Sequence, residues 1–337
     1  MDITTVIAAA VAFLVTFIFG YPLIPFLKKL HFGQTIREDG PKWHESKQGT
    51  PTMGGLLIIL GTVVSVIICS LLTPITKSAM FNTPNRTKTC EWLAALGLSL
   101  GMGFIGFLDD YIKVVKKRNL GLTARQKTFL QLLVSAAFLS TLALCGMDKT
   151  WIPFVGMVDI NYGIGLIFWP IALFFVYGFT NAVNLTDGID GLATSVTIIV
   201  SCAFLLLGGM FGYIGESIYA SAIAGALIGF IVWNAHPAKV FMGDTGSLFL
   251  GGAVVGMSFA INRPIILIFV GIIYLIEAFS VIIQVSHYKR TKKRIFKMAP
   301  LHHHFEMCGW SEEKIVFVFS LITLIASVAV IVPIIYL

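Results

Sequence analysis

The sequence predicts an all-α, polytopic integral membrane protein with about ten transmembrane helices. Of its 337 residues, 57% are hydrophobic and only 12% are charged. Soluble domains carry about twice that share of charged residues. Basic residues also gather in alternate loops, as expected for a chain that crosses a membrane repeatedly. We expect one transmembrane domain over residues 1–337, without a separate soluble domain.

Apolar windows of about 19 residues identify the individual spans. The first window has no basic residue before it and is too long for the core of a signal peptide, so a retained transmembrane helix is expected. An even number of spans places both termini on one side of the membrane. The ten predicted spans lie at roughly residues 4–27, 53–73, 90–108, 128–146, 163–183, 192–212, 217–235, 246–262, 264–286 and 314–337.

The distribution of Lys and Arg predicts the orientation of these spans. The loops after the first, third, fifth, seventh and ninth spans contain 19 of the 24 Lys and Arg residues. Because basic loops stay in the cytoplasm, we expect these loops inside the cell and both termini outside. The net charge of +7 is therefore explained by orientation, and no nucleic-acid partner is expected. The five scattered Cys residues have no metal-ligand spacing and predict no disulfide framework.

Two adjacent carboxylates, Asp109 and Asp110, end the third apolar segment. Such a pair is tolerated when a divalent cation or a cationic side chain lies beside it. Helical spacing places Asp109, Lys113 and Lys116 on one face. That face is suited to a carboxylate–metal centre with phosphate-binding lysines. The alternative is that this basic tract, which continues to Arg125 and Lys127, contacts lipid headgroups.

Three other cytoplasmic loops bring further polar residues to the same membrane face. The first loop has Lys47 and Thr52 in a Gly- and Thr-rich stretch, which is typical of an anion site or of a plain turn before a helix. The fifth and seventh loops concentrate short polar side chains next to glycines, where the alternative role is helix capping. Their candidates are Asn184, Asp187, Asp190, Asn234, Phe241 and Asp244.

The ninth loop, residues 287–313, is the longest on this face. Its basic stretch, Lys289–Lys297, has interspersed apolar residues and predicts a short amphipathic helix at the membrane interface. The consecutive histidines His302, His303 and His304 follow. Three successive positions on a helix cannot all face one metal ion, so phosphate contacts are favoured over a zinc site.

The loop motifs at 46–55, 107–113, 184–192, 241–247 and 300–306 together closely resemble those of the bacterial phospho-N-acetylmuramoyl-pentapeptide transferases. These enzymes belong to the superfamily of polyprenyl-phosphate N-acetylhexosamine-1-phosphate transferases. The resemblance implies a ten-helix, often homodimeric enzyme of the bacterial cytoplasmic membrane whose active site faces the cytoplasm. It further implies Mg2+-dependent transfer of phospho-MurNAc-pentapeptide from UDP-MurNAc-pentapeptide to undecaprenyl phosphate, giving lipid I and UMP in the first membrane step of peptidoglycan synthesis.

The resemblance also implies a role for each candidate residue. Asp244 and Asp110 would hold Mg2+, and Asp109 would act on the lipid phosphate. Phe241 would stack on uracil, while the histidines would contact phosphate or sugar, with His302 and His303 catalytic and His304 in substrate binding. Lys113, Lys116 and either Arg125 or Lys127 would supply positive charge. The nucleotide pocket would be lined by Lys47, Thr52, Asn184, Asp187, Asp190, Asn234 and Phe241.

Two other functions are consistent with parts of the sequence. A related transferase would take UDP-GlcNAc in place of the muramoyl nucleotide. A UDP-sugar transporter would place acidic residues near the middle of its spans, where Glu277 is the principal example. The clustering of the other acids at one face favours a transferase. Direct attack by the lipid phosphate and a phospho-enzyme route both fit the sequence.

Overall fold

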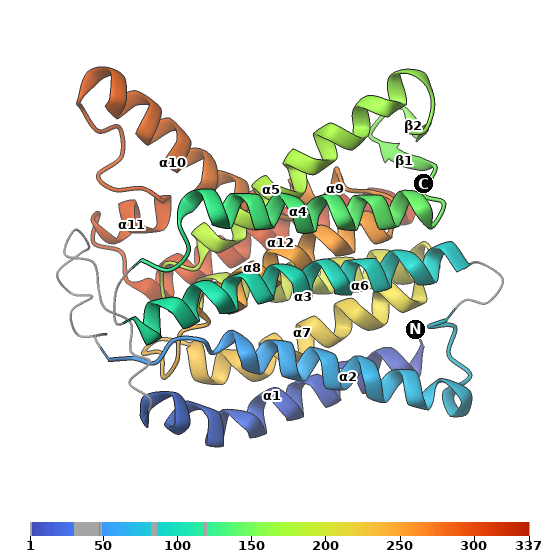
Figure 1. Cartoon of the computed structure of the whole chain (residues 1–337), viewed down its shortest axis with the longest axis horizontal. Helices are drawn as coiled ribbons and strands as arrows, with labels where there is room; N and C mark the ends of the chain where they lie inside the picture. Colours follow the sequence, from blue (N-terminus) through green and yellow to red (C-terminus); the bar gives the residue numbers. More distant parts are fainter. Residues whose placement is uncertain (1, 30–46, 48, 82–85, 117–119, 337) are drawn as a thin grey trace.

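The computed structural model describes residues 2–29, 47, 49–81, 86–116 and 120–336. The basic loop residues Arg37, Lys42, Lys117 and Arg118, which contributed to the predicted orientation, lie outside these ranges. The described chain is a bundle of long helices with one small β-hairpin (Figure 1). Its first helix begins and its last helix ends at the same end of the bundle, opposite the short helix α11.

Eight helical segments of the described chain are long and apolar enough to cross a membrane. The other two predicted spans correspond to α8 and to the pair α9 and α10, which are separated at Gly271. The helices are α1 (Ile3–Lys29), α2 (Gly55–Thr76), α3 (Arg86–Val115), α4 (Ala124–Leu144), α5 (Phe168–Thr186), α6 (Leu192–Met210), α7 (Ile214–Asn234), α8 (Gly243–Ala260), α9 (Ile266–Val270), α10 (Ile272–Thr291), α11 (Leu301–Glu306) and α12 (Glu312–Tyr336), with a 3-10 turn at Gly163–Ile167.

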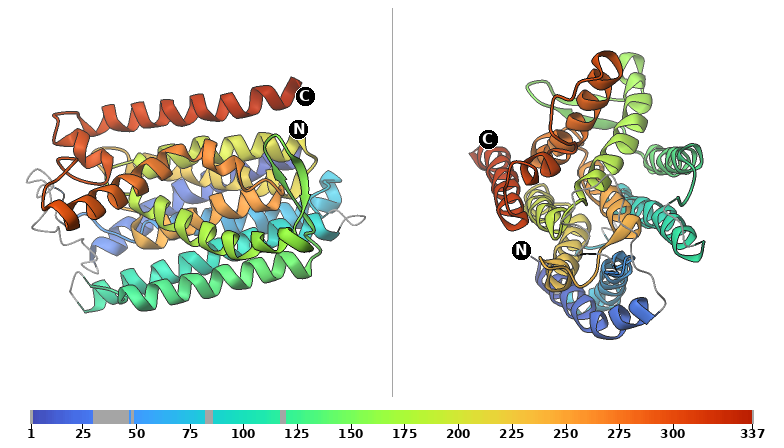
Figure 2. Two further views of the ribbon diagram at one scale, coloured as in Figure 1. Left: turned by 90° about the horizontal axis from the view of Figure 1, so that it is seen from above. Right: turned by 90° about the vertical axis from the view of Figure 1, so that its left-hand side faces the viewer.

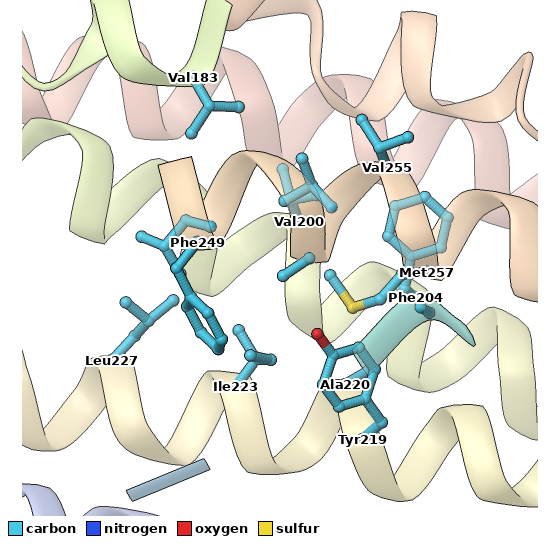
Figure 3. Packing of buried hydrophobic residues seen from close by; sticks show 14 of the residues in the cluster. Val183, Val200, Phe204, Tyr219, Ala220, Ile223, Leu227, Phe249, Val255 and Met257 are labelled. Atoms are coloured by element: carbon cyan, nitrogen blue, oxygen red, sulfur yellow. The ribbon is translucent and has the colours of Figure 1, made fainter. Parts of the chain in front are cut away.

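Helices α7 and α8 form the centre of the bundle because their residues are apolar or small on nearly every side. Figure 3 shows their packing, with Ile223 of α7 pointing toward Phe249 of α8 and Tyr219 of α7 toward Met257 of α8. Outer helices instead expose large apolar side chains, such as Leu71 and Phe174, as expected of surfaces that contact lipid. Because α8 is packed on nearly every side, its first turn is held in a fixed position.

The connection between α4 and α5 contains a β-hairpin, although the sequence predicts an all-α protein. Strand β1 (Lys149–Ile152) pairs antiparallel with β2 (Gly156–Asp159). The backbone N–H of Trp151 donates to the carbonyl of Asn262, 2.9 Å away, which joins the hairpin to the turn after α8. The hairpin lies at the end of the bundle where α1 begins (Figure 1).

The predicted amphipathic helix at Lys289–Lys297 is wrong. Helix α10 continues to Thr291, and residues 292–300 are then irregular before α11 begins. The side chain of Gln284 explains this path. Its carbonyl oxygen accepts from the N–H groups of Ile295 and Phe296, both at 3.0 Å, and its amide donates to the carbonyl of Phe296 at 2.9 Å. These bonds satisfy backbone groups that a helix would have paired internally.

Helices α5 and α10 contact each other but lean out of the bundle in different directions (Figures 1 and 2). Helix α10 exposes Phe279, Ile282 and Ile283. By contrast α3 and α8 run side by side through the bundle. Their close alignment brings the last turns of α3 against the first turn of α8.

Candidate active site at one end of the bundle

Three aspartates converge where α3 ends and α8 begins. Carboxylate oxygens of Asp109, Asp110 and Asp244 all lie within 4.8 Å of one another. Gly106 makes this approach possible, because a Cβ at this position would overlap the backbone carbonyl of Asp244. The predicted convergence of these aspartates is thus seen in the structure.

Asp110 holds the first turn of α8. Its Oδ2 accepts from the backbone N–H and the hydroxyl of Thr245, at 2.9 and 2.7 Å, and its Oδ1 accepts from the N–H of Asp244 at 3.2 Å. These N–H groups have no partner within the helix, so a carboxylate from another helix stabilises this terminus. Asp110 is therefore a capping residue as well as a candidate metal ligand.

Two lysines neutralise part of the negative charge. Lys113 contacts Asp109 at 2.6 Å and Asp244 at 2.8 Å, and Lys127 contacts the same oxygen of Asp244 at 3.1 Å. Asn184 donates to the other oxygen of Asp244 at 2.7 Å. The site therefore combines three carboxylates with cations that suit the oxygens of a phosphate group.

Two of the predicted cations lie elsewhere. Arg125 is exposed near the start of α4, and Lys127, two residues later, reaches Asp244 instead. Lys116 is exposed just beyond the end of α3. The turn before α4 sets this register, because the N–H of Leu122 donates to Asp109 at 2.7 Å.

Changing Lys127 to Gln should therefore reduce the enzymatic rate by about tenfold or more, because Asp244 loses a charge-assisted contact. The matched change of Arg125 to Gln, on the same helix turn, should alter the rate by less than about twofold. Steady-state kinetics of both purified variants check this pair. An equal loss in the two variants would mean that the assignment of Lys127 over Arg125 is wrong.

A second cluster surrounds Lys47. Its amine lies 2.7 Å from Asp190 and 2.6 Å from Glu312, the first residue of α12. The other oxygen of Asp190 contacts His236 at 3.1 Å and accepts from the N–H of Ala238 at 3.0 Å. Four segments far apart in the sequence meet here.

Glu312 and His236 are site residues that the sequence analysis missed. Glu312 stands at the end of the predicted ninth loop, just before the last predicted span, where acidic residues are common at the start of a helix. His236 stood in a predicted loop beside Asn234 and was given no role. Their proximity to Asp190 and Lys47 depends on tertiary packing, so no local pattern indicated it.

The predicted pocket residues Thr52, Asn234 and Phe241 have different environments. Thr52 lies beside the aspartates, since a Cβ at Gly243 would meet Thr52 Oγ1 and Asp110 Oδ2, each at 2.6 Å. Phe241 is partly buried, and its backbone bonds to Pro51 and Gly54 join the two loops. Asn234 is buried, accepting from Thr194 at 2.7 Å and donating to the carbonyl of Val240 at 3.1 Å. Asn234 therefore stabilises the loop between α7 and α8 from the protein interior.

Asp187 ends α5 next to these clusters. Burial raises the pKa of its carboxyl well above the usual range, and repulsion from Asp244 and Asp110 adds to the rise. Asp187 is therefore close enough to Asp244 and Asp110 for their charges to disfavour its ionised form.

The three histidines on α11 diverge, as predicted. His302 is fully buried, and its ring Nδ1 lies 3.0 Å from Glu277, which also accepts from the backbone N–H of His302 at 3.1 Å. Its Nε2 has no hydrogen-bond partner among the described residues and points at Gly188. His303 bonds to Glu306 at 2.6 Å, and His304 accepts from the N–H of Lys297 at 3.1 Å.

Glu277 on α10 thus has a structural partner in His302 of α11. A carboxylate that binds Nδ1–H orients the imidazole and directs Nε2 toward the site. Orienting His302 gives Glu277 a structural role, so this acid no longer favours a transporter.

Carboxylates, lysines and an oriented histidine at one end of an apolar bundle define an integral membrane enzyme suited to phosphate chemistry. Comparison with known proteins agrees. The model of the family "Glycosyl transferase family 4" matches residues 92–262, and "Phospho-N-acetylmuramoyl-pentapeptide-transferase signature 1" matches residues 47–59. The chain belongs to the phospho-N-acetylmuramoyl-pentapeptide-transferase family.

Curated relatives match nearly the whole chain. A phospho-N-acetylmuramoyl-pentapeptide-transferase of Clostridium perfringens (strain SM101 / Type A) is 48% identical, covering 96% of this chain and 95% of its own. The enzyme of the same name from Clostridioides difficile (strain 630) is 45% identical over 95% and 94%. That of Bacillus mycoides (strain KBAB4) is 44% identical over 93% and 92%.

Proposed function

We propose that this membrane transferase moves phospho-MurNAc-pentapeptide from UDP-MurNAc-pentapeptide to undecaprenyl phosphate, yielding lipid I and UMP. The observation that carries the proposal is the meeting of Asp109, Asp110 and Asp244 with Lys113 and Lys127. The site lies where α3 ends and α8 begins, so a soluble nucleotide and a lipid phosphate can reach it from one face.

The reaction exchanges one diphosphate linkage for another. An oxygen of the lipid phosphate forms a bond to the sugar-bearing phosphorus of the nucleotide, and the bond from that phosphorus to the UMP oxygen breaks. Lys113 and Lys127 offset negative charge on the diphosphate and on departing UMP. Asp109 takes the proton of the lipid phosphate in the direct route, or attacks phosphorus itself in the phospho-enzyme route. Trapping of a radiolabelled phospho-protein distinguishes the two.

Mg2+ fits the donor set of this site. Three carboxylates within 4.8 Å supply the hard oxygen ligands that Mg2+ prefers. Asp244 and Asp110 would hold it, as the family resemblance implies, which leaves Asp109 to act on the lipid phosphate. When bound, Mg2+ supplies charge neutralisation and polarises phosphoryl oxygens.

The second cluster is proposed to bind the nucleotide. Lys47, Asp190 and Phe241 would bind the uridine portion, with the partly buried ring of Phe241 stacking on uracil.

We propose that the site faces the bacterial cytoplasm, with ten crossings of the membrane and both termini outside. Cysteine labelling at His303 in intact cells checks this orientation, since reaction with an impermeant reagent would overturn it. A homodimer remains a prediction from the family resemblance.

The substrate is tested with protein purified in detergent. UDP-MurNAc-pentapeptide and UDP-GlcNAc are supplied separately, each with undecaprenyl phosphate and Mg2+, and UMP is measured. UMP formation with the muramoyl nucleotide alone is the expected result. Preference for UDP-GlcNAc would assign the related transferase activity, and release of UDP would mean that the sugar moves without its phosphate.

A further inference from the structure

A buried carboxylate, Glu312, begins α12 at the end of the bundle that holds the aspartates. Its side chain is only 9% exposed. Helix α12 packs against α6 and lies on the opposite side of the bundle from α4, the helix that supplies Lys127 to Asp244 (Figure 2). A buried charge needs a compensating partner. For Glu312 that partner comes from the second cluster, around Lys47.

The side chain of Lys47 lies between two carboxylates. Its Nζ is 2.6 Å from Oε1 and 2.7 Å from Oε2 of Glu312, and 2.7 Å from Oδ1 of Asp190. Oε2 of Glu312 also accepts from the backbone N–H of Asp190 at 3.0 Å. An ammonium group has three N–H donors, and these carboxylates take at least two of them. Lys47 is therefore a cross-link between α12 and the turn before α6.

The same carboxylates could in principle face a metal ion. Ligand atoms of Asp190, His236 and Glu312 lie within 4.8 Å of one another. Neighbouring carboxylates are stabilised either by a divalent cation or by a cationic side chain. The Lys47 ammonium already lies between Asp190 and Glu312, so the cluster has its cation.

The segment after Lys47 connects this cross-link to Phe241. The N–H of Thr50 donates to the carbonyl of Lys47 at 3.1 Å, which closes a turn. The N–H of Phe241 then donates to the carbonyl of Pro51 at 2.9 Å, and the N–H of Gly54 donates to the carbonyl of Phe241 at 2.8 Å. A displacement of Lys47 would therefore move the backbone that holds Phe241.

We propose that Glu312 is a positioning residue for nucleotide binding. By holding Lys47 against Asp190, it fixes the loop that is bonded to Phe241. This inference rests on the proposed function, in which Lys47, Asp190 and Phe241 bind the uridine portion. Because Glu312 acts through Lys47, its loss should weaken nucleotide binding more than it slows the reaction at the three aspartates.

Glu312→Gln tests this role in the purified full-length protein. Glutamine keeps the length of the side chain and an oxygen that can accept from the N–H of Asp190, but it removes the charge that faces Lys47. The Kd of UMP, measured by calorimetry, and the KM of UDP-MurNAc-pentapeptide should each rise at least about tenfold, whereas kcat should fall less than about threefold.

Glu313→Gln is the control, because it removes the charge of the next residue, whose side chain is 61% exposed. Its Kd for UMP should stay within about twofold of the wild type. Thermal unfolding of each variant verifies that it is folded. If Glu312→Gln does not fold, Glu312→Asp takes its place, because it keeps the charge but withdraws it from Lys47 by one methylene group.

Lys47→Met separates this inference from the proposed function. Lys47→Met should weaken UMP binding at least as much as Glu312→Gln, and the double variant should bind no more weakly than Lys47→Met alone, because the two residues act as a unit. Wild-type UMP binding in Lys47→Met would overturn both the proposed nucleotide pocket and this inference. If Lys47→Met weakens binding but Glu312→Gln leaves it unchanged, lowers only kcat, or adds its full effect in the double variant, the positioning role alone is overturned.

Discussion

Replacing Asp244 by Asn is expected to lower the rate of UMP formation by about two to three orders of magnitude. The carboxylate contacts Lys113, Lys127 and Asn184 at 2.8, 3.1 and 2.7 Å. Asparagine keeps the shape of the side chain but removes the charge, which leaves both lysines without their shared partner and deprives the site of an anionic metal ligand. Steady-state rates of the purified variant measure the effect.

Glu313→Gln is the matched control, because it removes a largely exposed acidic charge at the same end of the bundle. Its rate should stay within about twofold of the wild type, as for most exposed substitutions. Excess EDTA should abolish wild-type turnover, and Mg2+ should restore it. Full activity in EDTA, or an Asp244→Asn variant that turns over normally, would contradict the proposed centre.

The second large effect is expected from Gly106→Ala. The added methyl group would overlap the backbone carbonyl of Asp244 and lie 2.7 Å from the N–H nitrogen of Thr245. Overpacking of this kind costs about 1–3 kcal/mol. A displacement of Asp244 by about 1 Å would reduce the rate about a hundredfold. Activity and thermal unfolding of the same preparation separate a misplaced site from an unfolded protein.

Gly97→Ala is the control on the same helix. A Cβ at Gly97 has no neighbouring atom within 4 Å, so the substitution should preserve activity. It should also stabilise the protein by up to about 1 kcal/mol, because alanine is the better helix former. If Gly106→Ala retained wild-type activity, the tight approach of α3 to α8 would not be what positions Asp244.

The aspartate site was predictable because charged residues at the ends of apolar segments are costly and must gather at the membrane surface. Asp109, Asp110 and Asp244 each follow this rule. The choice between Arg125 and Lys127 was not predictable. It depends on the turn through Leu122, whose backbone N–H donates to Asp109 and fixes the start of α4 relative to α3.

The irregular segment after α10 shows a different limit. Its basic and apolar residues alternate in a way that is typical of an interfacial helix, yet one distant side chain, Gln284, bonds its backbone at Ile295 and Phe296. Likewise, Glu312 resembled an ordinary first-turn acid until packing placed it against Lys47. A local sequence pattern predicts a helix or a strand. Hydrogen bonds from one side chain elsewhere in the chain can impose a different backbone path.

The hydrogen bonds from Thr245 and Asp244 to Asp110 have a consequence for genetics. If an Asp110 variant were selected only for loss of growth, its defect would be attributed to the catalytic reaction. The same change, however, also loosens the start of α8. Its phenotype would then respond to temperature and to expression level, as folding lesions do. Second-site suppressors would be sought along the interface of α3 with α8, in the part that lies away from the aspartates.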